Sequence, residues 1–84
     1  ADLEYVLGAS LVQSSQTSEG TIHLLQALKL NPRQKQALNF LGIAMQKQGN
    51  YQDAANYYRR ALEIDADYPA ARENLERIAK ISPP

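Results

Sequence analysis

The 84-residue sequence contains no cysteine and no tryptophan, and its one histidine is His23. Without cysteine the chain forms no disulfide, carries no thiolate nucleophile and offers no cysteine ligand to zinc. A lone histidine is a poor basis for a metal site or a catalytic base, so we interpret His23 as an exposed helix residue. The sequence also lacks a glycine-rich phosphate loop and a nucleophile elbow. We therefore expect no catalytic residue, no bound metal and no cofactor.

Neither sign of charge is in excess, and no apolar segment is long. Nine basic and nine acidic residues give a formal net charge of zero, which disfavours nucleic-acid partners. No apolar run approaches the roughly 20 residues that span a bilayer, so we expect no membrane partner. The start of the chain is acidic where a signal peptide is basic, and a chain without an initial Met is expected to be an excised piece or a processed product. Its length corresponds to one domain with a small core.

The sequence repeats itself at a spacing of thirty-four residues, most clearly from residue 38 to residue 61. A fixed period of this length is typical of stacked helical hairpins. The pairs that carry the period are Leu7 and Leu41, Gly8 and Gly42, Leu24 and Tyr58, Ala27 and Ala61, and Leu28 and Leu62.

Apolar residues recur every three or four positions in five segments, which predicts five helices. We expect them at about residues 2–14, 18–30, 33–48, 51–64 and 69–81. Pro32 should end the second helix, and Gly49 should end the third in the left-handed conformation. Asn50 is expected to cap the fourth helix through its side chain. Gly8 and Gly20 are expected to form the close contact between the first two helices.

The second copy of the period resembles the tetratricopeptide repeat, a helix–turn–helix family of the same length. The residues that carry the resemblance are Leu41, Gly42, Met45, Gly49, Tyr51, Ala54, Tyr58 and Ala61. The first copy is degenerate, because Gly20, Thr17 and Glu4 stand where the family prefers alanine, an aromatic residue and Trp or Leu. The resemblance implies an all-α, right-handed superhelical stack of antiparallel hairpins (an α-solenoid). It divides the single domain into a first repeat (1–34), a second repeat (35–68) and a C-terminal capping helix with a tail (69–84).

The resemblance also implies a concave groove, lined by the first helix of each hairpin, that holds an extended peptide. The residues mapped to it are Tyr5, Ala9, Val12, Gln36, Asn39, Ile43, Gln46, Lys47, Glu73, Arg77 and Lys80. The groove would be apolar at its N-terminal end and charged at its C-terminal end, which suits a ligand with an aliphatic or aromatic anchor and an acidic group. Alternatively, its polar residues form only a solvated helix face. If the groove is used, replacing Asn39 and Lys47 by Ala should weaken peptide binding without lowering the melting temperature.

Two partner classes are disfavoured. One subset of the family grips the C-terminal carboxylates of chaperones with basic and asparagine side chains. The matching positions here hold Tyr5, Ala9, Phe40, Ala70 and Asn74, so this chaperone motif is an unlikely ligand. Related hairpin repeats read RNA through basic residues at matched positions, and the matched pairs Tyr5/Asn39, Ala9/Ile43 and Val12/Gln46 contain none.

The sequence therefore favours a non-enzymatic protein–protein interaction module with a groove for a protein or peptide partner. The alternative is a structural element that self-associates or stacks on further repeats of a longer protein. Apolar residues cover more than one side of the first helix, whereas the fifth helix is charged on its outer side. This asymmetry predicts a homo-oligomer through the N-terminal helix or a missing upstream repeat.

Overall fold

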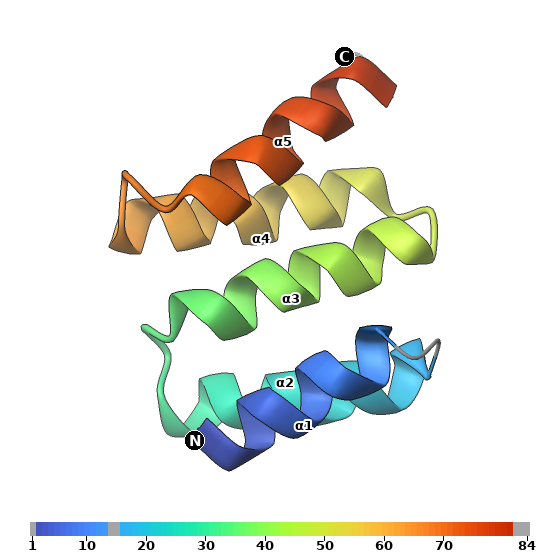
Figure 1. The fold of residues 1–84 in the computed structure, drawn as a ribbon, viewed down its shortest axis with the longest axis vertical. Helices are drawn as coiled ribbons and strands as arrows, with labels where there is room; N and C mark the ends of the chain where they lie inside the picture. The colour runs from blue at the N-terminus through green and yellow to red at the C-terminus, as the bar shows by residue number, and fades with distance from the viewer. Residues whose placement is uncertain (1, 14–15, 82–84) are drawn as a thin grey trace.

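The computed structural model describes the backbone of residues 2–13 and 16–81, and the side chains of residues 7–12 and 16–81. This part of the chain forms five helices and contains no strand: α1 (Asp2–Gln13), α2 (Thr17–Leu30), α3 (Lys35–Lys47), α4 (Tyr51–Ile64) and α5 (Pro69–Ile81) (Figure 1). The prediction of an all-α fold is confirmed, and the expected helix ends agree with the observed ends to within two residues.

The helices form antiparallel hairpins stacked along the long axis of a molecule measuring 34 × 26 × 16 Å (Figure 1). Each helix packs on the next one in sequence, and in addition α1 packs on α3 and α3 packs on α5. Within the described residues, α2 and α4 do not pack against each other. The odd-numbered helices α1, α3 and α5 therefore lie next to one another on one side of the stack. We call the surface formed by α1, α3 and α5 the odd-helix face.

One apolar core runs from α1 to α5. Its largest fully buried side chains come from four of the helices, and small alanines fill the remaining helix contacts, so that neighbouring backbones approach closely. The large residues are Tyr58, Leu24, Leu38, Leu41 and Val12, and the fully buried alanines are Ala27, Ala37, Ala44, Ala54, Ala61 and Ala71.

Gly8 and Gly42 occupy equivalent places in the two hairpins. A Cβ atom added to Gly8 would lie 2.7 Å from Cγ of Leu24 and 2.9 Å from the carbonyl oxygen of Gly20. A Cβ atom added to Gly42 would lie 2.3 Å from Cε1 of Tyr58. Leu24 and Tyr58 are themselves one period apart. The predicted close approach of Gly8 and Gly20 is confirmed. In each hairpin the glycine of the first helix packs against the residue at the same repeat position of the second helix.

The turns that follow α2 and α4 repeat the same hydrogen bonds. The N–H groups of Asn31 and Asp65 each donate to the carbonyl four residues earlier, at 2.8 and 3.0 Å. The N–H of Arg33 donates to Oδ1 of Asn31 at 3.2 Å, and the N–H of Asp67 donates to Oδ1 of Asp65 at 3.1 Å. Both turns therefore need a short side chain with an acceptor oxygen at this position, which explains Asn31 and Asp65 without any ligand.

The turn between α3 and α4 agrees with one prediction and contradicts another. Gly49 has a φ of +83°, as expected of the residue that ends α3. The side chain of Asn50, in contrast, makes no hydrogen bond to the start of α4, so the predicted side-chain cap is wrong. The backbone of Asn50 lies at φ −88° and ψ 70°, outside the extended region in which a capping side chain faces the first N–H groups. Its N–H instead donates to the carbonyl of Met45 at 2.8 Å.

Candidate interaction face

The residues predicted to line a groove all belong to α1, α3 and α5, but the exposure of their side chains differs widely. Gln36, Ile43 and Gln46 are half-buried, Lys47, Glu73, Arg77 and Lys80 are exposed, and Ala9, Val12 and Asn39 are buried. Tyr5 belongs to α1, and its side chain lies outside the described residues. Among the described side chains, the accessible part of the predicted set is therefore on α3 and α5.

Val12 is a core residue. Its side chain is fully buried, and a Cβ atom added to Gly20 would lie 2.7 Å from Cγ2 of Val12. Because Gly20 has no side chain, Val12 takes up the space between α1 and α2. Ala9 is also buried. These two residues are not available to a ligand, and the expected apolar end of the groove is not formed by them.

A line of hydrogen bonds joins α3 to α5 on the odd-helix face. Nδ2 of Asn74 donates to Oδ1 of Asn39 at 3.0 Å, and Nη1 of Arg77 donates to Oδ1 of Asn74 at 2.9 Å. Asn39 is buried in this contact, whereas Arg77 is exposed at the other end. Asn39 therefore holds the two helices together, and its partner Asn74 fixes the guanidinium of Arg77 on the surface. This role of Asn74 was not predicted from the sequence.

Gln46 and Lys47 also have partners within the chain. Oε1 of Gln46 accepts a hydrogen bond from the hydroxyl of Tyr58 at 3.0 Å. Burial raises the pKa of Tyr58, an effect that the positive charge of Arg77 only partly opposes, so the phenol stays neutral and donates. Nζ of Lys47 donates to the carbonyl oxygen of Val12 at 2.8 Å. A cation at the C-terminal end of α1 suits the helix dipole, so Lys47 ties the first hairpin to the second.

These contacts revise one expectation. Asn39 and Lys47 are both engaged between helices, so replacing them by Ala should lower stability as well as change the odd-helix face. Ala variants at these two positions would therefore change peptide affinity and the melting temperature together, so they do not test the groove alone. Glu73, Arg77 and Lys80 are more suitable for such a test, because they are exposed.

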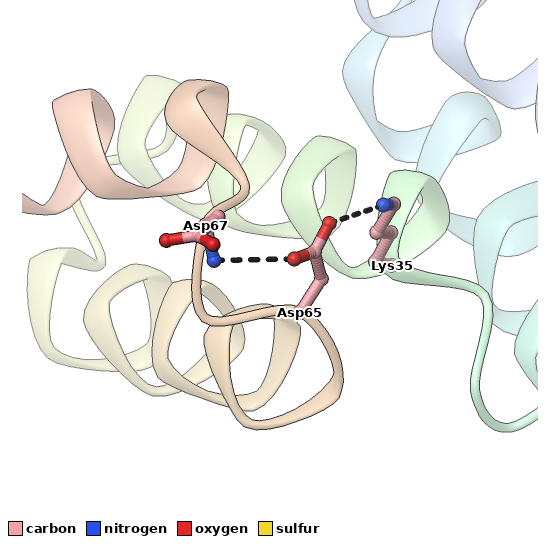
Figure 2. A network of polar contacts seen from close by, with 3 residues as sticks. All are labelled: Lys35, Asp65 and Asp67. Carbon is pink, nitrogen blue, oxygen red and sulfur yellow. Dashed lines mark hydrogen bonds and ion pairs between the residues drawn. The ribbon is translucent and has the colours of Figure 1, made fainter.

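A second polar cluster, shown in Figure 2, fixes the turn between α4 and α5. The ammonium group of Lys35, at the start of α3, forms an ion pair with the carboxylate of Asp65 and lies 5.0 Å from the centroid of the Tyr68 ring. The bond from Lys35 and the N–H of Asp67 hold the pKa of Asp65 below its usual value. This cluster positions the beginning of α5, and with it the charged side chains of the odd-helix face.

No group of three or more His, Cys, Asp or Glu side chains in the described part of the chain is placed to hold a metal ion. None of the helices described has both the length and the apolar character needed to cross a membrane. Among the residues predicted to line a groove, the exposed ones are charged (Lys47, Glu73, Arg77 and Lys80), and Ile43 is a half-buried apolar residue.

Comparison with known proteins agrees with the stacked helical hairpins of the structure. The family model "Tetratricopeptide repeat" matches residues 35–68. The chain is 36% identical over 53 residues to "Heat shock protein STI1" of Saccharomyces cerevisiae and 32% identical over 73 residues to "Antiviral innate immune response effector IFIT1" of Homo sapiens. These matches cover 63% and 81% of this chain but only 9% and 15% of the two relatives. Residues 35–68 therefore belong to the tetratricopeptide repeat family.

Proposed function

We propose that the odd-helix face binds an extended segment of a partner protein. Tetratricopeptide repeats generally mediate protein–protein interactions. The observation that best supports this use here is the hydrogen-bonded line from Asn39 through Asn74 to Arg77, because it holds an exposed cation in a fixed place beside α3. A pre-positioned polar group costs less conformational entropy on binding than a freely rotating one.

The charges of this face favour a segment that carries an acidic group. Arg77 and Lys80 are exposed on successive turns of α5, and Glu73 precedes them. Ile43 of α3 is the half-buried apolar side chain that can accept an aliphatic or aromatic anchor. Exposed charges of this kind steer association and select partners more than they add affinity. We therefore infer a non-enzymatic module with a salt-dependent, acidic peptide ligand.

A matched pair of arginines tests this proposal. Arg77 donates to the asparagine three residues before it, and on α4 Arg59 does the same, with Nη1 3.3 Å from Oδ1 of Asn56. Peptides selected from a displayed library would be titrated against the Arg77→Glu and Arg59→Glu variants by fluorescence anisotropy. Each reversal makes the same change of charge. Because an exposed pair is worth about 0.5 kcal/mol, turning attraction into repulsion at Arg77 should weaken an acidic peptide about fivefold.

Arg59→Glu should leave that affinity unchanged. If both reversals weaken the selected peptides equally, or if selection yields no acidic preference, the odd-helix face is not the binding surface. A circular dichroism melt of each variant serves as the control for folding, since both side chains are exposed.

An assembly role is the second candidate, and the N-terminal end of the stack favours it. Leu7 is 42% exposed and Ser10 is exposed, whereas the matched Leu41 and Ala44 of α3 are fully buried in a helix that packs on α2. The surface of α1 is therefore of the kind that receives a further hairpin. Linking a second copy of residues 35–68 directly before residue 1 keeps the period, and it should raise the melting temperature and bury Leu7. An unchanged melting temperature would reject this role.

A further inference from the structure

The outer surface of α2 is apolar where the matching surface of α4 is polar. On the side of α2 that faces away from the core, Ile22 is 57% exposed and Leu25 is 46% exposed. One period later, α4 carries Asn56 and Arg59 at these positions, and both are exposed. We define the α2 outer stripe as the exposed residues of this side: Ser18, Glu19, Ile22, Leu25, Gln26 and Lys29.

Stacking of further hairpins would not cover this stripe. The second hairpin has a neighbour on each side, since α3 packs on α2 and α4 packs on α5. Asn56 and Arg59 nevertheless remain exposed. The positions of Ile22 and Leu25 therefore point away from the stack in any array of this kind. An occupant of the α2 outer stripe has to come from outside the array.

The central part of the first hairpin also carries less charge than the matching part of the second. Residues 5–28 contain a single formally charged side chain, Glu19, whereas the matching residues 39–62 contain four, namely Lys47, Asp53, Arg59 and Arg60. Depletion of charge together with exposed aliphatic side chains distinguishes the centre of a protein interface from ordinary surface. The two charges of the stripe, Glu19 and Lys29, stand in the first and last turns of α2.

We propose that two copies of this chain associate through their α2 outer stripes, with the two α2 helices antiparallel about a two-fold axis. Glu19 and Lys29 lie equally far from residue 24, about 7.5 Å along the helix on either side. An axis at that point sets Ile22 of one copy opposite Gln26 of the other, about 1.5 Å along the helix from Leu25, so the two aliphatic side chains meet. It also sets each Glu19 against the other copy's Lys29, so the surface is complementary to itself, as an isologous contact requires.

The dimer should be weak, because one pair of helices buries less than the roughly 1,200–2,000 Å² of a standard interface. We expect dissociation constants of about 10⁻⁵ to 10⁻³ M. The contact is independent of the proposed binding function: α2 does not contribute to the odd-helix face, so dimerisation leaves both such faces open. Two linked faces would then bind a divalent partner with higher avidity.

Sedimentation equilibrium of the whole chain from about 10 µM to 1 mM tests the proposal. We expect the weight-average mass to rise toward that of a dimer, and Ile22→Glu to weaken association at least tenfold. Ile81→Glu is the matched control, since Ile81 is 51% exposed at the far end of the stack. Leu7→Glu separates this contact from one through α1. Both control variants should associate like the unchanged chain.

A charge swap gives the second test. Glu19→Lys should weaken the dimer about tenfold, and adding Lys29→Glu should restore it, because the ion pair is then re-formed with its charges exchanged. All five exchanged positions are exposed, so melting curves should show folded proteins. A chain that stays monomeric at 1 mM overturns the proposal. So does a dimer that Leu7→Glu or Ile81→Glu disrupts as strongly as Ile22→Glu, or a double variant that remains as weak as Glu19→Lys.

Discussion

Replacing Gly42 by Ala should destabilise the chain, although Ala is the better helix former. The new Cβ atom would lie 2.3, 2.6 and 2.7 Å from three carbons of the Tyr58 ring. That ring is fully buried, and its hydroxyl is bonded to Gln46, so it cannot move aside freely. Overpacking of a core costs about 1–3 kcal/mol, and this site belongs at the upper end. The higher helix propensity of Ala offsets about 1 kcal/mol of this cost.

The net loss should be about 2 kcal/mol, which in a domain of this size lowers the melting temperature by about 10 °C. Urea unfolding followed by circular dichroism measures it. Gly49→Ala is the comparison, because Gly49 has no atom within 4 Å of an added Cβ and has a φ of +83°. That variant should lose about 1 kcal/mol through backbone strain alone.

A double-mutant cycle separates the two causes. In a Tyr58→Leu background the ring is gone, so the cost of Gly42→Ala should fall by at least about 0.5 kcal/mol. The cost of Gly49→Ala should not change in that background. The reasoning is refuted if Gly42→Ala is neutral or stabilising in the unchanged chain, or if its cost is the same with and without the ring.

Three further predictions concern the polar contacts. Asn39→Ala leaves the amide of Asn74 without its buried acceptor, so the free energy of unfolding in urea should fall by about 1–2 kcal/mol. Lys47→Ala removes the cation from the end of α1 and should cost about 0.5–1 kcal/mol in low salt, and less in 1 M NaCl, by the same assay. The pKa of Asp65 is lowered in the folded state, chiefly by Lys35, so its contribution is present above about pH 4 and is lost as the pH falls through the folded value. Asp65→Asn should therefore flatten the dependence of melting temperature on pH below about pH 4, and an unchanged slope would contradict the assignment.

The period of the sequence predicted the helices and the glycine contacts well, because both depend on residue size at a fixed spacing. Gly8 packs against Leu24 and Gly42 packs against Tyr58, each on the second helix of its hairpin. Both pairs recur at the same spacing in the sequence, so the period was enough to predict their equivalence. The end of the second helix was predicted from Pro32, which follows Asn31 and restricts its backbone.

The candidate site was predicted less well, because helical position tells which side a residue is on but not what lies opposite it. Val12 is buried because Gly20 leaves space for its side chain between α1 and α2. Asn39 is buried because it accepts a hydrogen bond from Asn74 of α5, which the thirty-four-residue period does not relate to it. Lys47 was correctly expected at the surface, but its partner is a backbone carbonyl, which no pattern of side chains reveals. The failed cap at Asn50 has a similar cause, since it depends on a backbone angle.

We claim that α1 with α2 and α3 with α4 form two equivalent hairpins, so that α1, α3 and α5 share one face. Nuclear Overhauser spectroscopy tests it directly at the two glycines. We predict cross-peaks between the Hα protons of Gly8 and the methyl protons of Leu24, and between those of Gly42 and the ring protons of Tyr58, with ring-current shifts at Gly42. Cross-peaks at Gly42 without their counterpart at Gly8 would contradict the claim.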